Sequence, residues 1–90
     1  MDPSAAGADP AVVGSKDEWD AFCAAFGTAV RARREQLEIS QEELGHRADL
    51  DRTYVSGIER GMRNPTLKII ARMSKALKTR PSKLLAATEQ

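Results

Sequence analysis

Apolar residues recur at steps of three and four positions along most of this chain, which is the spacing of amphipathic α-helices. The apolar positions of the first such segment are Trp19, Phe22, Phe26, Val30 and Leu37. With Ser15 as an N-cap residue, they predict a helix over about 16–37. A second stripe, consisting of Leu67, Ile70, Met73, Ala76 and Leu77, predicts a helix over about 66–77. Pro81 is suited to a first helical position and predicts a last helix over about 81–86.

Two short helices are predicted between these segments. The capping box formed by Ser40 and Glu43 begins a helix over about 41–48. Asp51 is an N-cap residue for a helix over about 52–60. The apolar positions of this pair are Leu44, Ala48, Leu50, Val55 and Ile58. They can contact one another only if the two helices cross, which is the helix-turn-helix pattern that presents its second helix to a DNA major groove.

The order and composition of these segments resemble a known family. The stretches that carry the resemblance are residues 31–37, 40–44, 54–61 and 64–67. They are similar to the lambda-repressor/Cro-like (XRE-like) helix-turn-helix family, and residues 50–61 look most like the controller proteins of restriction-modification systems. The resemblance implies an all-α, compact five-helix fold. It also implies a sequence-specific transcriptional regulator that binds double-stranded DNA as a homodimer on a (pseudo)palindromic operator.

One position departs from the family pattern. The turn between the two short helices usually has glycine where this chain has Asp49, because that residue adopts a left-handed backbone conformation. Aspartate is among the few other residues that tolerate this conformation at modest cost. We therefore expect Asp49 to be left-handed and the motif to be intact.

The second short helix carries the residues expected to contact base edges. In the family register these are Arg52, Thr53 and Ser56. Arg52 stands at the first position of its helix, where the macrodipole disfavours a cation, and this favours a DNA partner for it. An arginine there can bind guanine O6 and N7 through its planar guanidinium, and the Thr53 hydroxyl or methyl can contact a base edge.

A second set of residues is expected at the sugar-phosphate backbone, where contacts position the protein without selecting a sequence. The resemblance implies that the set consists of Gln41, Tyr54, Gly57, Arg60, Arg63 and Asn64. Gln41 is also expected to brace the first residue of the recognition helix. Gly57 has no side chain and is expected to let the backbone approach DNA closely.

Two further pairs are expected to have structural roles. The family joins the positions of Arg34 and Glu59 by a partly buried ion pair, which would tie the first helix to the recognition helix. Leu84 and Leu85 follow a helix whose apolar stripe is already used by the core. We therefore expect these two leucines to form the dimer interface.

Charge is distributed unevenly along the chain. The formal net charge is +1, but residues 1–20 carry five acids against one lysine, and residues 21–90 carry thirteen lysines and arginines against eight acids. The predicted helical part is therefore basic, as a DNA-binding surface requires. Residues 1–15 have few apolar positions and are predicted to be a disordered acidic Pro/Ala-rich tail, with the DNA-binding domain over 16–90.

The sequence offers little for catalysis, metal binding or membrane insertion. Cys23 is the single cysteine and His46 the single histidine, so neither has a partner at metal-ligand spacing. No nucleophile–base pair or glycine-rich phosphate loop is present, and we expect neither enzymatic activity nor a cofactor. No apolar run reaches membrane-spanning length and no signal peptide is evident, which predicts a cytoplasmic protein. The resemblance implies association with bacterial or phage DNA.

A second hypothesis comes from the class of partner-binding modules. An antitoxin-type protein would chiefly hold a partner protein and regulate its own operon. The acidic segment 1–15 could then be the part that binds the partner. Loss of partner binding on removal of that segment would distinguish this hypothesis from a DNA-binding regulator without a partner.

Overall fold

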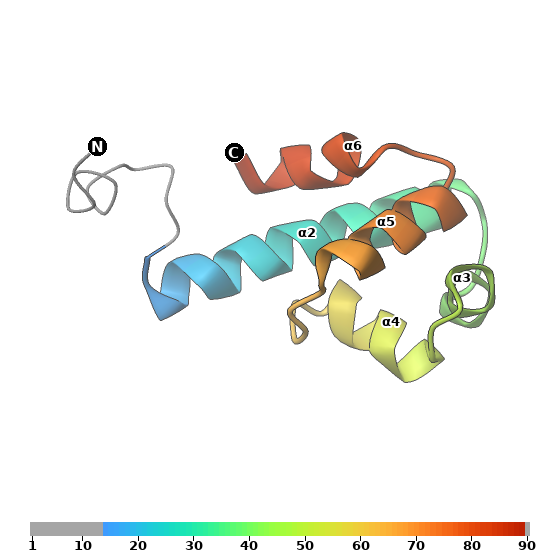
Figure 1. The fold of residues 1–90 in the computed structure, drawn as a ribbon, viewed down its shortest axis with the longest axis horizontal. Coiled ribbons are helices and arrows are strands. Elements are labelled where there is room, and N and C mark those ends of the chain that lie inside the picture. The colour runs from blue at the N-terminus through green and yellow to red at the C-terminus, as the bar shows by residue number, and fades with distance from the viewer. Residues whose placement is uncertain (1–13, 90) are drawn as a thin grey trace.

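The computed structural model describes residues 14–89, and these contain five α-helices and one 3₁₀ turn. The helices are α2 (Lys16–Gln36), α3 (Gln41–Ala48), α4 (Arg52–Glu59), α5 (Leu67–Ala76) and α6 (Pro81–Ala86), followed by η1 (Ala87–Glu89). The long helix α2 forms the axis of the molecule, with α6 along one side and α4 on the other (Figure 1). The all-α, five-helix prediction is confirmed. The tail predicted over residues 1–15 lies outside the described residues except for Gly14 and Ser15.

At four of the helix starts, a side chain accepts a hydrogen bond from a backbone amide that has no partner within the helix. Ser15, Ser40 and Thr66 each accept a hydrogen bond from the backbone amide three residues later. Asp51 accepts one from the Thr53 amide at 2.7 Å. Among the hydrogen bonds of the described residues, the Glu43 carboxylate pairs with Arg47 at 2.8 Å. Of the capping box predicted at α3, the hydrogen bond from the Glu43 amide to the Ser40 hydroxyl is therefore present.

Four of the helices end in a residue with a left-handed backbone. These residues are Glu38, Asp49, Gly61 and Lys78, with φ of 57°, 58°, 73° and 52°. At Gly61 the next amide donates back to the Gly57 carbonyl at 2.8 Å, the Schellman arrangement that satisfies the last helical carbonyls. After each of the other three residues, the next backbone amide likewise donates to the carbonyl five positions earlier. Asp49 is left-handed, as its register predicts.

The core lies between α2 and the other four helices. Its buried members are Phe26, Val30, Leu44, Ala48, Val55, Ile58, Met73, Ala76, Leu77 and Leu84. Two expectations were wrong. Leu67 is 81% exposed, because α5 begins at this residue and nothing covers its side chain. Leu84 is buried within the protomer, so it cannot form the dimer interface, whereas Leu85 is only half-buried.

Glycines allow α2 and the end of α4 to approach closely. A Cβ on Gly27 would collide with the Ile58 carbonyl oxygen and come within 2.8 Å of the Glu59 carbonyl oxygen. A Cβ on Gly61 would lie 2.9 Å from Cα of Ala24. The backbone of α2 therefore rests directly on the last turn of α4 and fixes where α4 sits. Within residues 14–89, no helix is long and apolar enough to cross a membrane.

Candidate DNA interface

Helix α4 presents one face to the core and its first turn to the surface. Val55 and Ile58 are buried in the core, while Arg52 and Thr53 are exposed at the start of the helix. Ser56, the third predicted base-contacting residue, is half-buried one turn further on. Because the buried face cannot rotate outward, Arg52 and Thr53 are the side chains of α4 best placed to enter a groove.

Asp51 fixes the start of this helix. Its carboxylate accepts a hydrogen bond from the Thr53 amide at 2.7 Å, and this hydrogen bond holds the pKa of Asp51 below its ordinary value of 3.8. The Thr53 hydroxyl adds to the shift. An ionised carboxylate at a helix N-terminus also interacts favourably with the macrodipole. The first turn of α4, which carries Arg52 and Thr53, is therefore held by this hydrogen bond in the free protein.

Arg63 covers the middle of α4, and this corrects the expectation for Gly57. The Arg63 guanidinium lies over the Tyr54 ring, 5.4 Å from its centroid. A Cβ on Gly57 would approach Cγ of Arg63 to 2.8 Å, and Gly57 is buried. The missing side chain makes room for the Arg63 stem, so the backbone at Gly57 is covered by Arg63 in the free protein.

The remaining backbone-contact candidates surround the end of α4. Arg60 is exposed at the C-terminal cap position, and its Nε lies 3.4 Å from the Ser56 carbonyl oxygen. Asn64 is exposed in the loop before α5. Arg60, Arg63 and Asn64 thus lie in one segment that follows α4, and two of the three are arginines.

A buried ion pair ties α2 to the end of α4. Arg34 donates from Nε to Glu59 Oε2 at 2.6 Å and from Nη2 to Glu59 Oε1 at 3.0 Å. Its Nη1 donates to the Ile39 carbonyl at 2.9 Å. The side chains are only 13% and 3% exposed. The Glu59 hydrogen bond raises the pKa of Arg34 above its ordinary value, so the guanidinium stays charged throughout the physiological range.

Gln41 belongs to the same network. Its Nε2 donates to Glu59 Oε1 at 3.1 Å. The expectation that Gln41 braces the first residue of the recognition helix was wrong, because Gln41 contacts the last residue of α4. The first residue of that helix, Arg52, is left exposed. Gln41 remains at the first position of α3, where the backbone amides ahead of Glu43 point outward from the helix start.

The chemistry available elsewhere is limited. Cys23 is buried, and this burial raises the pKa of its thiol, with Asp20 adding a smaller effect. The thiol is therefore protonated at neutral pH and is a poor nucleophile. His46 is exposed on α3. Within residues 14–89, no group of three or more His, Cys, Asp or Glu side chains could hold a metal ion.

Sequence reasoning missed two features that position the interface. Gly27 marks the crossing of α2 and α4, but nothing in the local pattern distinguishes it from an ordinary small residue. Arg33 donates from Nε to the Leu77 carbonyl at 2.9 Å and from Nη2 to the Lys78 carbonyl at 3.1 Å. It thereby caps the end of α5, and its charge and spacing alone did not separate it from Arg34.

The fold agrees with comparison to known proteins. The helix-turn-helix family model matches residues 30–84, more than half of the chain. The chain belongs to the helix-turn-helix family. Members of this family are DNA-binding transcriptional regulators, and the matched residues include all of α3, α4 and α5. The match begins inside α2, so the first turns of that helix precede it.

The helix-turn-helix relatives include several control proteins. Control protein C.BamHI of Bacillus amyloliquefaciens is 48% identical over 64 residues, which are 70% of this chain and 79% of the relative. Control protein C.MunI of a Mycoplasma species is 38% identical over 66 residues, or 72% of this chain and 89% of the relative. The crystal structure of the restriction-modification controller protein C.AhdI from Aeromonas hydrophila superposes with a TM-score of 0.68 at 40% identity, covering 69% of this chain and 94% of that one.

Proposed function

We propose that this chain binds double-stranded DNA sequence-specifically as a homodimer, with α4 in the major groove of each half of a two-fold symmetric operator. The observation that carries the proposal is the exposed first turn of α4. Arg52 and Thr53 are exposed at its start, and no acidic residue occupies that turn. The same helix is locked to α2 at its other end by Arg34 and Glu59.

Arg52 is assigned to base contact because its position is unfavourable without a ligand. A cation at the N-terminus of a helix opposes the macrodipole, and the neighbouring Asp51 carboxylate is engaged with the Thr53 amide. A guanine supplies two acceptors in the plane that a guanidinium requires. Thr53 and Ser56 complete the base-contacting set, with Ser56 closer to the core and therefore limited to a base that approaches the helix closely.

The DNA backbone is assigned to the flanking residues. Gln41 stands at the start of α3, where free amides and the helix dipole favour a phosphate. Tyr54, Arg60, Arg63 and Asn64 lie on the far side of α4. Phosphates held on both sides would set the depth and the register of α4 in the groove.

A homodimer follows from the small size of the contact. The short exposed face of one α4 covers about four to six base pairs, too few for useful specificity. Two copies related by a two-fold axis would place their recognition helices about 34 Å apart, one turn of DNA. Because Leu84 is buried in the protomer, the interface must use other residues.

We further propose that the regulated genes are those of a restriction-modification system, and that the protein has a binding role and not a catalytic one. Support comes from the control proteins among the relatives and from the C.AhdI superposition. The antitoxin-type alternative depends on the acidic segment 1–15, most of which lies outside the described residues. No observation on the described residues favours it.

Selection of bound sequences from a random duplex pool tests the proposal. The expected result is a motif of two inverted half-sites about 10 base pairs apart, protected in footprints by the purified protein. The matched variants are Arg52→Ala at the start of α4 and His46→Ala on the exposed surface of α3. Selection with the first should lose the guanine-bearing position of each half-site, and selection with the second should return the original motif. A pool that yields no motif would contradict the proposal.

A further inference from the structure

The loop after α4 presents one apolar side chain to solvent. Met62 is 70% exposed, and it lies between the exposed residues Arg60 and Arg63. Single exposed apolar residues are common on protein surfaces, so exposure alone identifies no partner. The way in which the end of α4 is capped makes this methionine different.

The cap of α4 places Met62 where an apolar side chain normally finds a partner. The Gly61 amide donates to the Ile58 carbonyl at 3.0 Å, and the Met62 amide donates to the Gly57 carbonyl at 2.8 Å. In this Schellman arrangement, the residue at the place of Met62 frequently packs against the side chain of the third- or fourth-last helical residue. These residues are Gly57, which has no side chain, and Ser56, which is polar. The usual apolar contact is therefore missing.

Two other helices end in the same arrangement and do make an apolar contact. Ile39 follows the end of α2 and Leu50 follows the end of α3, and both pack against the core. Met62 is not among the residues packed against the core. The surface over Gly57 that it could have covered is occupied by the stem of Arg63. The side chain of Met62 is thus directed to solvent at a position that is buried at two other helix ends.

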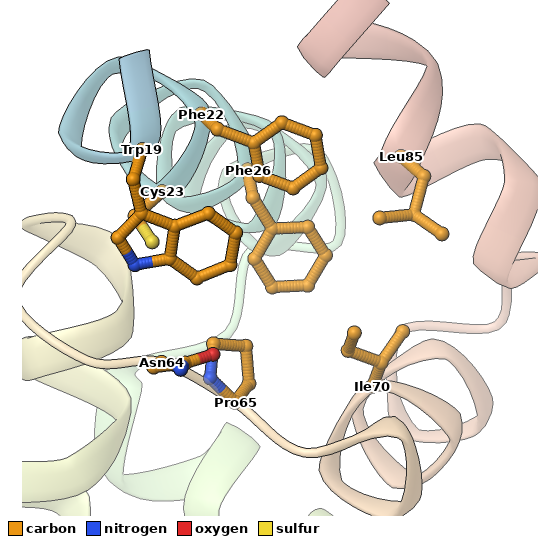
Figure 2. A pocket seen from close by; sticks show the side chains of 8 residues that line it. All are labelled: Trp19, Phe22, Cys23, Phe26, Asn64, Pro65, Ile70 and Leu85. Atoms are coloured by element: carbon orange, nitrogen blue, oxygen red, sulfur yellow. The ribbon is translucent and has the colours of Figure 1, made fainter. Parts of the chain in front are cut away.

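The backbone on both sides of Met62 is held against α2. A Cβ on Gly61 would lie 2.9 Å from Cα of Ala24. Further along the loop, Asn64 and Pro65 line a small pocket with the aromatic side chains of α2, and Figure 2 shows them facing these rings. The pocket measures about 50 Å³, whereas a cavity that holds benzene measures about 150 Å³. Little space is left between loop and helix, so the place of Met62 is fixed.

The length of α4 determines what Met62 meets on DNA. Its eight residues span roughly 12 Å at a rise of about 1.5 Å per residue, and the major groove is about 12 Å wide. With Arg52 inside the groove, the other end of α4 reaches the sugar-phosphate wall. The neighbouring minor groove begins on the other side of this wall. Arg60 and Arg63 bring two cations to the phosphates there, and the apolar surface beside these phosphates belongs to the deoxyriboses.

We propose that Met62 enters the minor groove beside the phosphates contacted by Arg60 and Arg63, and packs there against deoxyriboses and base edges. The inference rests on the DNA interface of the proposed function and adds a residue that selects sequence to a loop assigned to positioning. Methionine is one of the apolar residues that proteins insert into the minor groove.

The chemistry of the minor groove gives this contact a sequence preference. A·T and T·A pairs present only acceptors there, whereas a G·C pair adds the guanine 2-amino group. An apolar side chain against that group leaves a donor without a partner. Met62 therefore favours an A·T pair at the position where it enters.

Base analogues that change only the minor groove test the contact. In the selected operator, each adenine is replaced in turn by 2,6-diaminopurine, which adds a 2-amino group and keeps the major-groove edge of adenine. At one position in each half-site, the added group should weaken binding by the unmodified protein about fivefold or more. A G·C pair at that position should also weaken binding, and an inosine·C pair, which lacks the amino group, should restore the minor-groove contact.

The test variant is Met62→Ala, and Met62→Leu is the matched control. Because Met62 is 70% exposed, both variants should melt close to the unmodified protein. Met62→Ala should weaken operator binding about fivefold or more and lose the sensitivity to the added amino group. Met62→Leu keeps an apolar side chain and should retain most of the affinity and the sensitivity.

Oxidation by hydrogen peroxide reports separately on the exposure of Met62. The peroxide transfers one oxygen atom to the thioether sulfur, which becomes a sulfoxide, and water is released. Met62 should be oxidised faster than Met73, which is fully buried. Operator DNA should slow the oxidation of Met62 several-fold. An unchanged rate in the saturated complex would show that DNA does not cover this side chain and would overturn the contact.

The outcomes separate this contact from the DNA interface itself. An operator that tolerates the 2-amino group at every position, or equal sensitivity of Met62→Ala and the unmodified protein, would overturn the minor-groove contact and leave α4 as the recognition helix. A protein that selects no motif from the random pool would overturn the proposed function and this contact with it.

Discussion

The substitution Glu59→Ala tests whether the Arg34–Glu59 pair holds the recognition helix in place. Glu59 is 3% exposed and accepts hydrogen bonds from Arg34 Nε, Arg34 Nη2 and Gln41 Nε2. Its removal leaves the Arg34 charge 87% covered, with only the Ile39 carbonyl as a polar partner among the hydrogen bonds described. Gln41 loses its partner as well.

The expected cost follows from this burial. Removing one member of a buried ion pair typically destabilises a protein by about 3–5 kcal/mol, because an uncompensated charge stays behind. Arg34 keeps some contact with solvent and one carbonyl, so we expect the lower end of that range, about 3 kcal/mol. For a domain of this size, that corresponds to a fall in melting temperature of roughly 12–24 °C.

Thermal and urea unfolding followed by circular dichroism measure the loss. The matched control is Glu43→Ala, which removes a carboxylate from the exposed pair with Arg47 and should leave the melting temperature close to that of the unmodified protein, since exposed pairs are weak. The double variant Arg34→Met with Glu59→Leu should recover much of the loss, because apolar side chains of similar volume need no buried partner. A Glu59→Ala protein that melts within experimental error of the unmodified chain would refute the reasoning.

Three further outcomes are expected. Gly27→Ala should destabilise the fold by about 1–3 kcal/mol or more, because its Cβ meets the α4 carbonyls; unfolding equal to that of the exposed variant Thr28→Ala would contradict the crossing. Glu38→Gly should raise the free energy of unfolding by about 1 kcal/mol, because Glu38 has a left-handed backbone. Glu35→Gly inside α2 should lower it by a similar amount. If Glu38→Gly destabilised the protein and Glu35→Gly stabilised it, the left-handed conformation of Glu38 would be excluded. The pKa of Asp51 is lower in the folded protein than in the unfolded chain. The ionised Asp51 carboxylate should therefore stabilise the fold fully above about pH 4, and this contribution should be lost as the pH falls through the folded-state pKa. If the Asp51→Asn variant loses stability with falling pH in the same way as the unmodified protein, the result would argue against this role.

Local signals in the sequence were sufficient for the helices and their starts. Ser15, Ser40, Asp51 and Thr66 cap the helices that the apolar periodicity predicts. A cap depends on residues within three positions of each other, so the information is contained in a short window of sequence. The left-handed Asp49 was predictable for a similar reason, since its position in the motif requires that conformation.

Contacts between distant segments could not be predicted in the same way. Gly57 is covered because Arg63 folds back over it. The spacing of apolar residues cannot predict that a residue of the following loop packs against the helix. The apolar stripe assigned Leu67 to the core, but α5 begins there and nothing covers it. The pattern likewise could not show whether Leu84 faces its own core or a second copy, because both environments select the same residue.

The measurement that tests the account most directly compares Arg52→Ala and Arg63→Ala on the selected operator and on a scrambled duplex, across a range of salt concentrations. We expect Arg52→Ala to weaken operator binding by about 1–3 kcal/mol, or roughly 5- to 150-fold, and to leave scrambled DNA nearly unaffected. Arg63→Ala should weaken both duplexes by a similar factor and reduce the salt slope by about one. Equal loss on both duplexes for Arg52→Ala would contradict the assignment of α4 as the recognition helix.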